Sequence, residues 1–131
     1  MTNTEKIFEL TAPYDNVYQG NTKRILFVCS AGLLRSPTGA TVGAKMGFNT
    51  RSCGSNYSYA LVPISVNLVH WANIIYFVSI ENYIQSLSNF SGDTETIELI
   101  KRKAVNLRIK DEFNYMDPHL VSIFEKELSD A

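Results

Sequence analysis

Short apolar runs alternate with helical patterns from residue 23 onward, and this alternation constrains the fold more than any other feature of the sequence. Residues 25–28 and 74–78 are apolar runs with β-branched and aromatic content, typical of strands buried on both faces of a sheet. Weaker strand candidates are residues 104–109 and 48–52. Helical patterns fill the intervals, at residues 36–46, 64–71, 82–90 and 94–102. Strands that alternate with helices of this length predict an α/β fold, a three-layer sandwich in which helices flank a four-stranded parallel sheet.

A last helix is predicted to begin at Asp117 and Pro118, because the aspartate can cap a helix and the proline fits its first turn. Its apolar stripe would consist of Leu120, Val121, Phe124 and Leu128. Neither a repeat nor a linker divides the 131 residues. We therefore expect one domain over residues 22–131, preceded by an N-terminal extension at residues 1–21. In a parallel sheet covered on both faces, ligands bind beyond the carboxyl ends of the strands.

Composition and charge restrict the classes of function. The chain has 12 Lys and Arg against 13 Asp and Glu, a net charge of −1, whereas a surface for nucleic acid normally carries a basic excess. No apolar run approaches the roughly 18 residues of a membrane span, and the N-terminus lacks the regions of a signal peptide. Cys29 and Cys53 are too few for a disulfide framework. These features predict a cytoplasmic protein without nucleic-acid or membrane partners.

The first predicted strand leads directly into a loop in which Cys29 is followed by five residues, then Arg35 and Ser36. Five residues suffice to curl the backbone into a ring whose N–H groups point inward, and such a ring at a helix N-terminus binds oxyanions. The planar guanidinium of Arg35 matches two phosphate oxygens. The helix dipole and Arg35 both favour the thiolate of Cys29, to which Ser36 can donate a hydrogen bond. The ring residues expected to bind substrate are Ser30, Ala31, Gly32, Leu33 and Leu34.

This loop, with Pro37 and Thr38 after it, resembles the phosphate-binding loop of the low-molecular-weight protein-tyrosine-phosphatase family. Three further segments look like the family's R-S-A-G-T stretch, its W-A-D-x-I-x-x-M strand and its V-x-D-P-[FY] segment; they are residues 51–55, 71–78 and 109–113. The resemblance covers roughly residues 22–130.

The resemblance implies a hydrolase of phosphomonoesters that works through a cysteinyl-phosphate intermediate, without a metal ion or a cofactor. Cys29 would be the nucleophile, and the loop amides together with Arg35 would hold the phosphate oxygens. Ser36 would stabilise the thiolate, and Asp111 would protonate the leaving group as general acid. The partner would be a phosphorylated protein, tyrosine phosphate above all, or a small aryl or alkyl phosphate.

Two aspartates follow the last predicted strand, and either is a candidate acid. Asp117 is already explained as a helix start. Asp111 has the family's spacing from the strand, with an aromatic residue, Phe113, two positions later, so the resemblance favours Asp111. Phe113 either walls a phenyl-sized pocket opposite Leu33 or packs in the core.

The loop departs from the family pattern at three positions. Ala31 and Gly32 stand where the family has glycine and asparagine. Because glycine takes the same left-handed conformation, we expect the loop to keep its shape. The family's asparagine also braces the loop through neighbours that include a histidine; Tyr59 or Ala60 falls near that position, so this brace is missing. Leu34 replaces the second cysteine of many members, so an oxidised Cys29 is expected to lack a disulfide partner.

Three other interpretations compete with the phosphatase. In the structural one, Cys29 is a small buried hydrophobe and Arg35 a solvated helix residue. An arsenate reductase uses the same loop but needs further cysteines, and Cys53 alone does not supply the usual pair. A non-catalytic phosphate or phosphotyrosine binder would share the loop without the turnover.

Overall fold

Four parallel strands form the centre of the fold, in the order β2-β1-β3-β4. The computed structural model describes residues 23–32, 34–110 and 112–131, so the extension predicted for residues 1–21 lies outside it. The strands are β1 (Arg24–Cys29), β2 (Asn49–Gly54), β3 (Ile74–Phe77) and β4 (Ala104–Asn106). The predicted parallel sheet is therefore confirmed.

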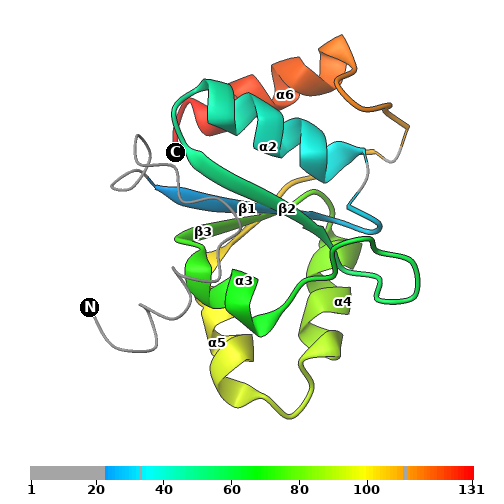
Figure 1. Ribbon diagram of the computed structural model, residues 1–131, viewed down its shortest axis with the longest axis vertical. Coiled ribbons are helices and arrows are strands. Elements are labelled where there is room, and N and C mark those ends of the chain that lie inside the picture. The colour runs from blue at the N-terminus through cyan, green and yellow to red at the C-terminus, as the bar shows by residue number, and fades with distance from the viewer. Residues whose placement is uncertain (1–22, 33, 111) are drawn as a thin grey trace.

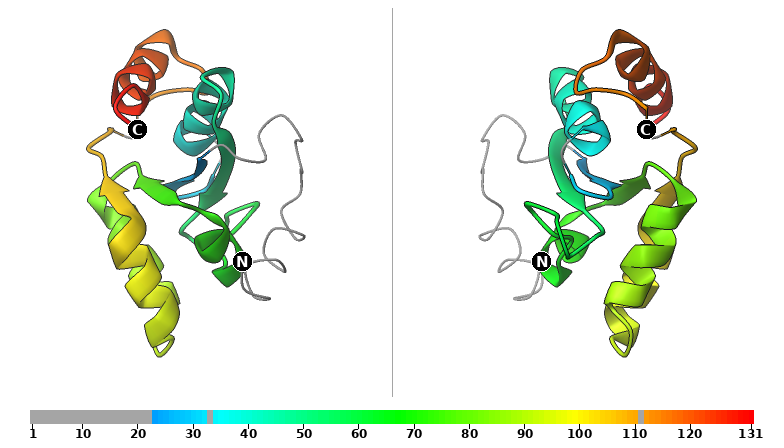
Figure 2. Two further views of the ribbon diagram at one scale, coloured as in Figure 1. Left: turned by 90° about the vertical axis from the view of Figure 1, so that its left-hand side faces the viewer. Right: turned by 90° about the vertical axis from the view of Figure 1, so that its right-hand side faces the viewer.

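Helices cover both faces of this sheet, as predicted. Their bounds are α2 (Arg35–Lys45), α3 (Val66–Trp71), α4 (Ile80–Asn89), α5 (Thr94–Lys103) and α6 (Pro118–Leu128). Helices α2 and α6 lie on one face, and α3, α4 and α5 lie on the other (Figure 1). The same three layers are visible when the molecule is turned (Figure 2). Among the helices of the described residues, none is long and apolar enough to cross a bilayer.

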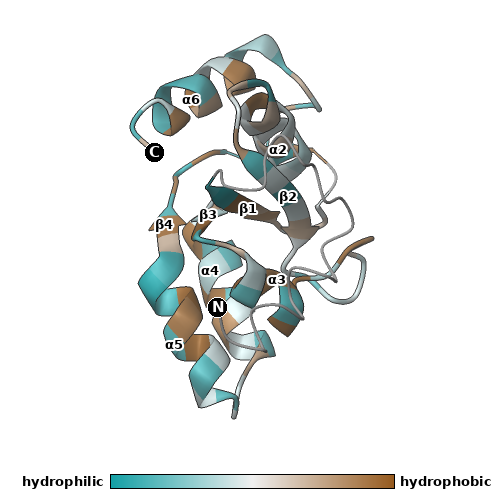
Figure 3. Ribbon diagram, turned by 60° about the vertical axis from the view of Figure 1, so that its left-hand side comes forward, coloured by the Kyte–Doolittle hydropathy of each residue, from teal (hydrophilic) through white to brown (hydrophobic). Residues whose placement is uncertain are grey.

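The central strand β1 is buried on both faces, which explains its unbroken apolar run. Ile25, Phe27 and Cys29 belong to the core on the side of α2 and α6. Leu26 and Val28 belong to the core on the side of α3, α4 and α5. This alternation follows from the two-residue period of a strand. Figure 3 shows the apolar colouring of this strand between the two helical layers.

Helix α6 begins where the sequence predicted it to begin. The side chain of Asp117 accepts a hydrogen bond of 2.9 Å from the backbone N–H of His119, and Pro118 is the first helical residue. Leu120, Phe124 and Leu128 are fully or almost fully buried. The apolar stripe therefore seats α6 on the sheet and on α2.

Strand β4 is shorter than the predicted run of residues 104–109. It ends at Asn106, although the N–H groups of Leu107 and Ile109 still donate to the carbonyls of Phe77 and Val78, at 2.8 and 2.9 Å. The pairing stops because β3 gives way to α4 shortly after Phe77. The segment after β4 therefore continues past the end of its neighbour and forms one wall of the site described next.

Candidate active site

A cavity of about 780 Å³ lies beyond the carboxyl ends of the strands, at the edge where a covered parallel sheet binds ligands. Three segments enclose it: the loop after β1, the start of α4, and the chain that follows β4. Its lining residues are Ser30, Arg35, Ser79, Ile80, Glu81 and residues 106–110. The cavity thus contains two members of the predicted phosphate-binding loop.

Cys29, the last residue of β1, has its sulfur surrounded by polar groups of the loop and helix that follow. The side chain is 4% exposed. Its Sγ lies 3.0 Å from the hydroxyl of Ser36, and the N–H of Gly32 donates to it at 3.2 Å. Both groups can donate a hydrogen bond that stabilises negative charge on sulfur. The contact predicted between Ser36 and Cys29 is present.

Gly32 makes the tight return of the loop possible. Its φ is +75°, in the left-handed region that glycine adopts without strain. A Cβ at this position would lie 3.0 Å from the backbone carbonyl carbon of Cys53. The sequence expectation of a left-handed glycine is confirmed, and the loop packs directly on the end of β2.

Arg35 is the first residue of α2, and its side chain is buried at the cavity wall. It is 5% exposed, and its Nη1 donates 2.9 Å to the backbone carbonyl of Ile109. This bond crosses from the loop to the segment after β4 and orients the guanidinium. A guanidinium carries five N–H donors, and this bond uses one of them. The alternative of a solvated Arg35 is wrong.

A buried amide on α4 contacts the loop, and sequence reasoning missed it. Asn82 is 1% exposed. Its Nδ2 donates to the hydroxyls of Ser30, at 3.0 Å, and Ser55, at 3.2 Å. Its Oδ1 accepts 2.7 Å from the hydroxyl of Ser79. Only the spacing Ser79-x-x-Asn82 directly after a strand hinted at a polar side chain turned inward.

Near the position where the family has a bracing histidine, this chain has Tyr59 and Ala60 instead. Tyr59 is 59% exposed. A Cβ added to Gly54 would meet the Cβ of Ala60 at 2.6 Å and the carbonyl oxygen of Ser30 at 2.6 Å. Ala60 therefore packs against the backbone beside the loop, where it offers no hydrogen bond from its side chain.

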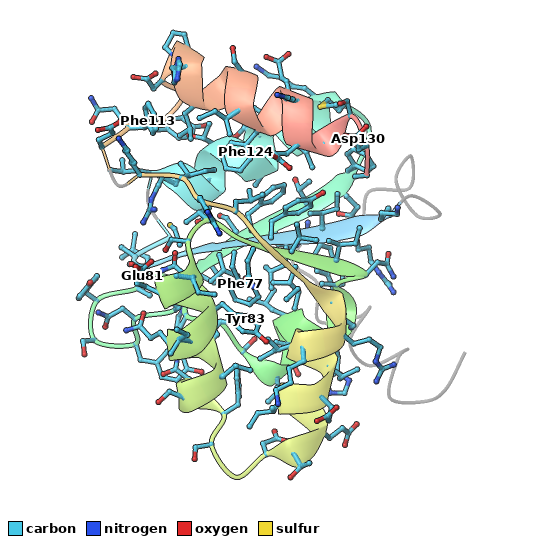
Figure 4. All side chains as sticks on the ribbon, turned by 180° about the vertical axis from the view of Figure 1, so that it is seen from behind. Phe77, Glu81, Tyr83, Phe113, Phe124 and Asp130 are labelled. Atoms are coloured by element: carbon cyan, nitrogen blue, oxygen red, sulfur yellow. The ribbon has the colours of Figure 1, made fainter. Side chains whose placement is uncertain are left out.

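Phe113 does not line the cavity. It packs against the core between the sheet and α6, and its ring stacks on His119 with centroids 5.7 Å apart. One of the two sequence alternatives, packing in the core, is therefore present; the other places Phe113 opposite Leu33, which lies outside the described residues. Figure 4 shows Phe113 beside the α6 layer and Glu81 at the start of α4. Asp111 and Leu33 lie outside the described residues, and Leu34 is 41% exposed.

Glu81 is a carboxylate in the cavity lining that sequence reasoning missed. A hydrogen bond from its own backbone N–H lowers its pKa, and the charge of Arg35 lowers it further. The side chain is therefore ionised at neutral pH, which makes it a poor proton donor. With Arg35, Arg108 and Lys110 in the same lining, the cavity carries more positive than negative charge.

Solved structures share this fold. The Wzb protein of Vibrio vulnificus, solved with benzylphosphonate, is 13% identical with a TM-score of 0.61, over 84% of this chain and 99% of that one. The YwlE arginine phosphatase of Geobacillus stearothermophilus is 17% identical with a TM-score of 0.57, over 82% and 86%. The low-molecular-weight protein tyrosine phosphatase of Campylobacter jejuni is 14% identical with a TM-score of 0.56, over 81% and 92%.

Comparisons of the amino-acid sequence alone give no match. No family model matches it, and no curated protein does. The likeness is therefore one of architecture, and it shows that the chain has the fold of the low-molecular-weight protein tyrosine phosphatases.

Proposed function

We propose that this protein hydrolyses phosphomonoesters, aryl phosphates such as phosphotyrosine above all, through a cysteinyl-phosphate intermediate. The observation that carries the proposal is the surroundings of Cys29. Its sulfur receives the N–H of Gly32 and lies against the hydroxyl of Ser36. Arg35, the next charged group along the chain, lines the adjoining cavity. A nucleophile, an anion site and a fixed cation therefore meet at one strand end.

In the first step the Cys29 thiolate attacks phosphorus. A sulfur–phosphorus bond forms as the bond from phosphorus to the ester oxygen breaks, and the leaving oxygen takes a proton from the general acid. In the second step water attacks the phosphocysteine, gives its proton to that same carboxylate, and releases inorganic phosphate and the thiolate. Arg35 and the loop amides stabilise the charge on the equatorial oxygens in both steps.

The fold supports this proposal through what its structural neighbours bind. One neighbour was solved with benzylphosphonate, a phosphonate attached to a benzyl group, and another is a protein tyrosine phosphatase by name. We assign the general acid to Asp111, because Asp117 is engaged in capping α6.

An arsenate reductase is disfavoured by the position of the second cysteine. The side chains of Cys29 and Cys53 belong to cores on opposite faces of the sheet. For Cys53 to react with Cys29, β1 or β2 would have to shift its register by one residue, because only such a shift moves a side chain to the other face of the sheet.

Turnover of an aryl phosphate in the presence of EDTA tests the proposal. We expect hydrolysis by the wild type and none by Cys29→Ser, while Cys29→Ser still binds vanadate because the amides and Arg35 remain. Cys53→Ala is the matched control and should keep its activity. Undiminished turnover by Cys29→Ser would refute the mechanism. Vanadate binding without turnover by the wild type would instead identify a phosphate-binding protein.

A second experiment tests the general acid. Asp111→Asn should slow hydrolysis of phenyl phosphate far more than that of a nitrophenyl ester, since a basic leaving group depends most on protonation, which is worth about 10²–10⁴-fold. Asp117→Asn should leave this dependence unchanged, because asparagine also caps helices. The reverse pattern would transfer the role to Asp117.

A further inference from the structure

Three strand ends meet at one buried side chain below the cysteine loop. Asn82 contacts Ser30 after β1, Ser55 after β2 and Ser79 after β3, through the three hydrogen bonds described above. Both N–H bonds and the carbonyl oxygen of its amide are used within one almost fully buried site. A buried amide is costly unless it is hydrogen-bonded, so the partners hold it in one orientation.

The direction of these hydrogen bonds is fixed by the rest of the network. The hydroxyl of Ser55 donates 2.7 Å to Oε1 of Gln85, so it accepts from Asn82. The hydroxyl of Ser79 donates to Oδ1, which places the NH₂ end of the amide toward the loop. Ser30 therefore accepts from Asn82, and its own proton is directed elsewhere. Because Ser30 lines the cavity, that proton is available to an anion bound there.

We propose that Asn82 is a positioning residue that fixes the cysteine loop and makes the hydroxyl of Ser30 a donor toward bound phosphate. Asn82 would replace the bracing contact that the family's asparagine makes with its side chain and that Gly32 cannot make. The backbone supports the same register, since the carbonyls of Cys29 and Ser30 accept from the N–H groups of Ser55 and Asn56 at 2.8 and 3.0 Å. The catalytic part of the proposal rests on the proposed function; the part concerning loop order does not.

The experiment compares Asn82→Ala with Asn89→Ala. Asn89 lies on the same helix and donates 2.7 Å to the carbonyl of Ser55, so its loss removes one hydrogen bond of the same network without contact to the loop. We expect amide exchange over residues 30–36 to become about fivefold to tenfold faster in Asn82→Ala, the effect of one or two lost hydrogen bonds. It should stay at the wild-type rate in Asn89→Ala.

Activity adds a second measurement. For an aryl phosphate, Asn82→Ala should lower kcat/KM by about tenfold to a hundredfold, and Ser30→Ala should lower it by a smaller factor. The double variant should be no worse than Asn82→Ala, because the amide acts on the anion through Ser30. Effects that multiply, or an equal loss in Asn89→Ala, would overturn the proposal and leave Asn82 a purely structural residue.

Two outcomes separate this proposal from the proposed function. If the wild type has no turnover but Asn82→Ala still loses loop protection, the positioning role stands and the phosphatase fails. If the wild type turns over and Asn82→Ala matches it in both measurements, the positioning role fails. Should Asn82→Ala not fold, Asn82→Asp keeps the side-chain size; its carboxylate accepts from Ser30, so it should lose vanadate affinity, and unchanged affinity would refute the proposal.

Discussion

Cys29 ends β1 and Cys53 is the last residue but one of the adjacent strand β2, yet their surroundings are opposite. Cys29 faces the layer of α2 and α6, where its sulfur contacts the hydroxyl of Ser36 and the N–H of Gly32. Cys53 faces the layer of α3, α4 and α5, within an apolar core, and is 0% exposed. Burial raises the pKa of the Cys53 thiol well above its ordinary value, and charge on Cys29 adds to this.

Ser36 connects these two environments. Its hydroxyl lies 3.0 Å from the sulfur of Cys29 and 3.3 Å from the backbone carbonyl of Cys53. Its single proton can donate to the carbonyl while Cys29 is a thiol and to the sulfur once Cys29 is a thiolate. The difference between the cysteines therefore arises from polar groups at the end of β1, and the residue type alone decides nothing about reactivity.

The largest expected difference is in alkylation. Iodoacetamide at neutral pH should modify Cys29 at least about a thousandfold faster than Cys53, because Cys53 reacts only through opening of a core that costs about 5 kcal/mol or more. Peptide mass spectrometry over a time course measures both rates. Equal rates would show that the environment of Cys29 confers no special reactivity.

Peroxide should inactivate the protein without a rapid rescue by thiols. Cys29 oxidises to the sulfenic acid and then further, because no second cysteine lies in the loop and Cys53 is on the other face of the sheet. Non-reducing mass spectrometry checks this result. A disulfide between Cys29 and Cys53 would contradict it and show that the strand ends rearrange.

Ser36→Ala should lower turnover by about tenfold to a hundredfold, since a hydrogen bond to a charged group contributes about 1.5–3 kcal/mol. Ser86→Ala is the matched control. Ser86 is also a buried helical serine, but its hydroxyl has no hydrogen-bond partner among the described residues, so its removal should leave turnover unchanged. Equal activity in the two variants would exclude a role for Ser36 at the sulfur.

The smallest effect concerns stability at high pH. Because the folded-state pKa of Cys53 is raised, its contribution to stability is complete below pH 9 and declines above it, where the unfolded thiol ionises. The decline is at most about 1.4 kcal/mol per pH unit. Urea unfolding between pH 8 and 10 should show a smaller decline in Cys53→Ala than in the wild type.

The comparison of the wild type with Cys53→Ala is needed because other groups titrate in the same pH range. Burial lowers the pKa of Lys103 to about 8, which increases stability as pH rises above 8, whereas the raised pKa of Tyr57 acts in the same direction as Cys53. Parallel curves for wild type and Cys53→Ala would contradict the assignment to Cys53.

Local patterns predicted the strands, the helices and the loop because each depends on neighbours in the chain. The apolar run of β1 reflects burial on two faces, and Asp117-Pro118 is a local signal for the start of a helix. Asn82 was missed because it is one polar residue on an amphipathic helix, and only the packing of α4 turns it inward. Phe113 was left open for the same reason: its contact with His119 is set by how the segment before α6 packs.

The bond from Arg35 to the carbonyl of Ile109 joins residues 74 positions apart, and this separation has a consequence for the order of folding. β1 pairs with β2 and β3 through closer residues, and contacts between distant residues form late because their loop must close first. During synthesis Arg35 emerges long before its partner exists. We therefore expect the guanidinium to be oriented only after the chain beyond β4 has joined the sheet, and recovery of the proposed anion binding on refolding should report that late step.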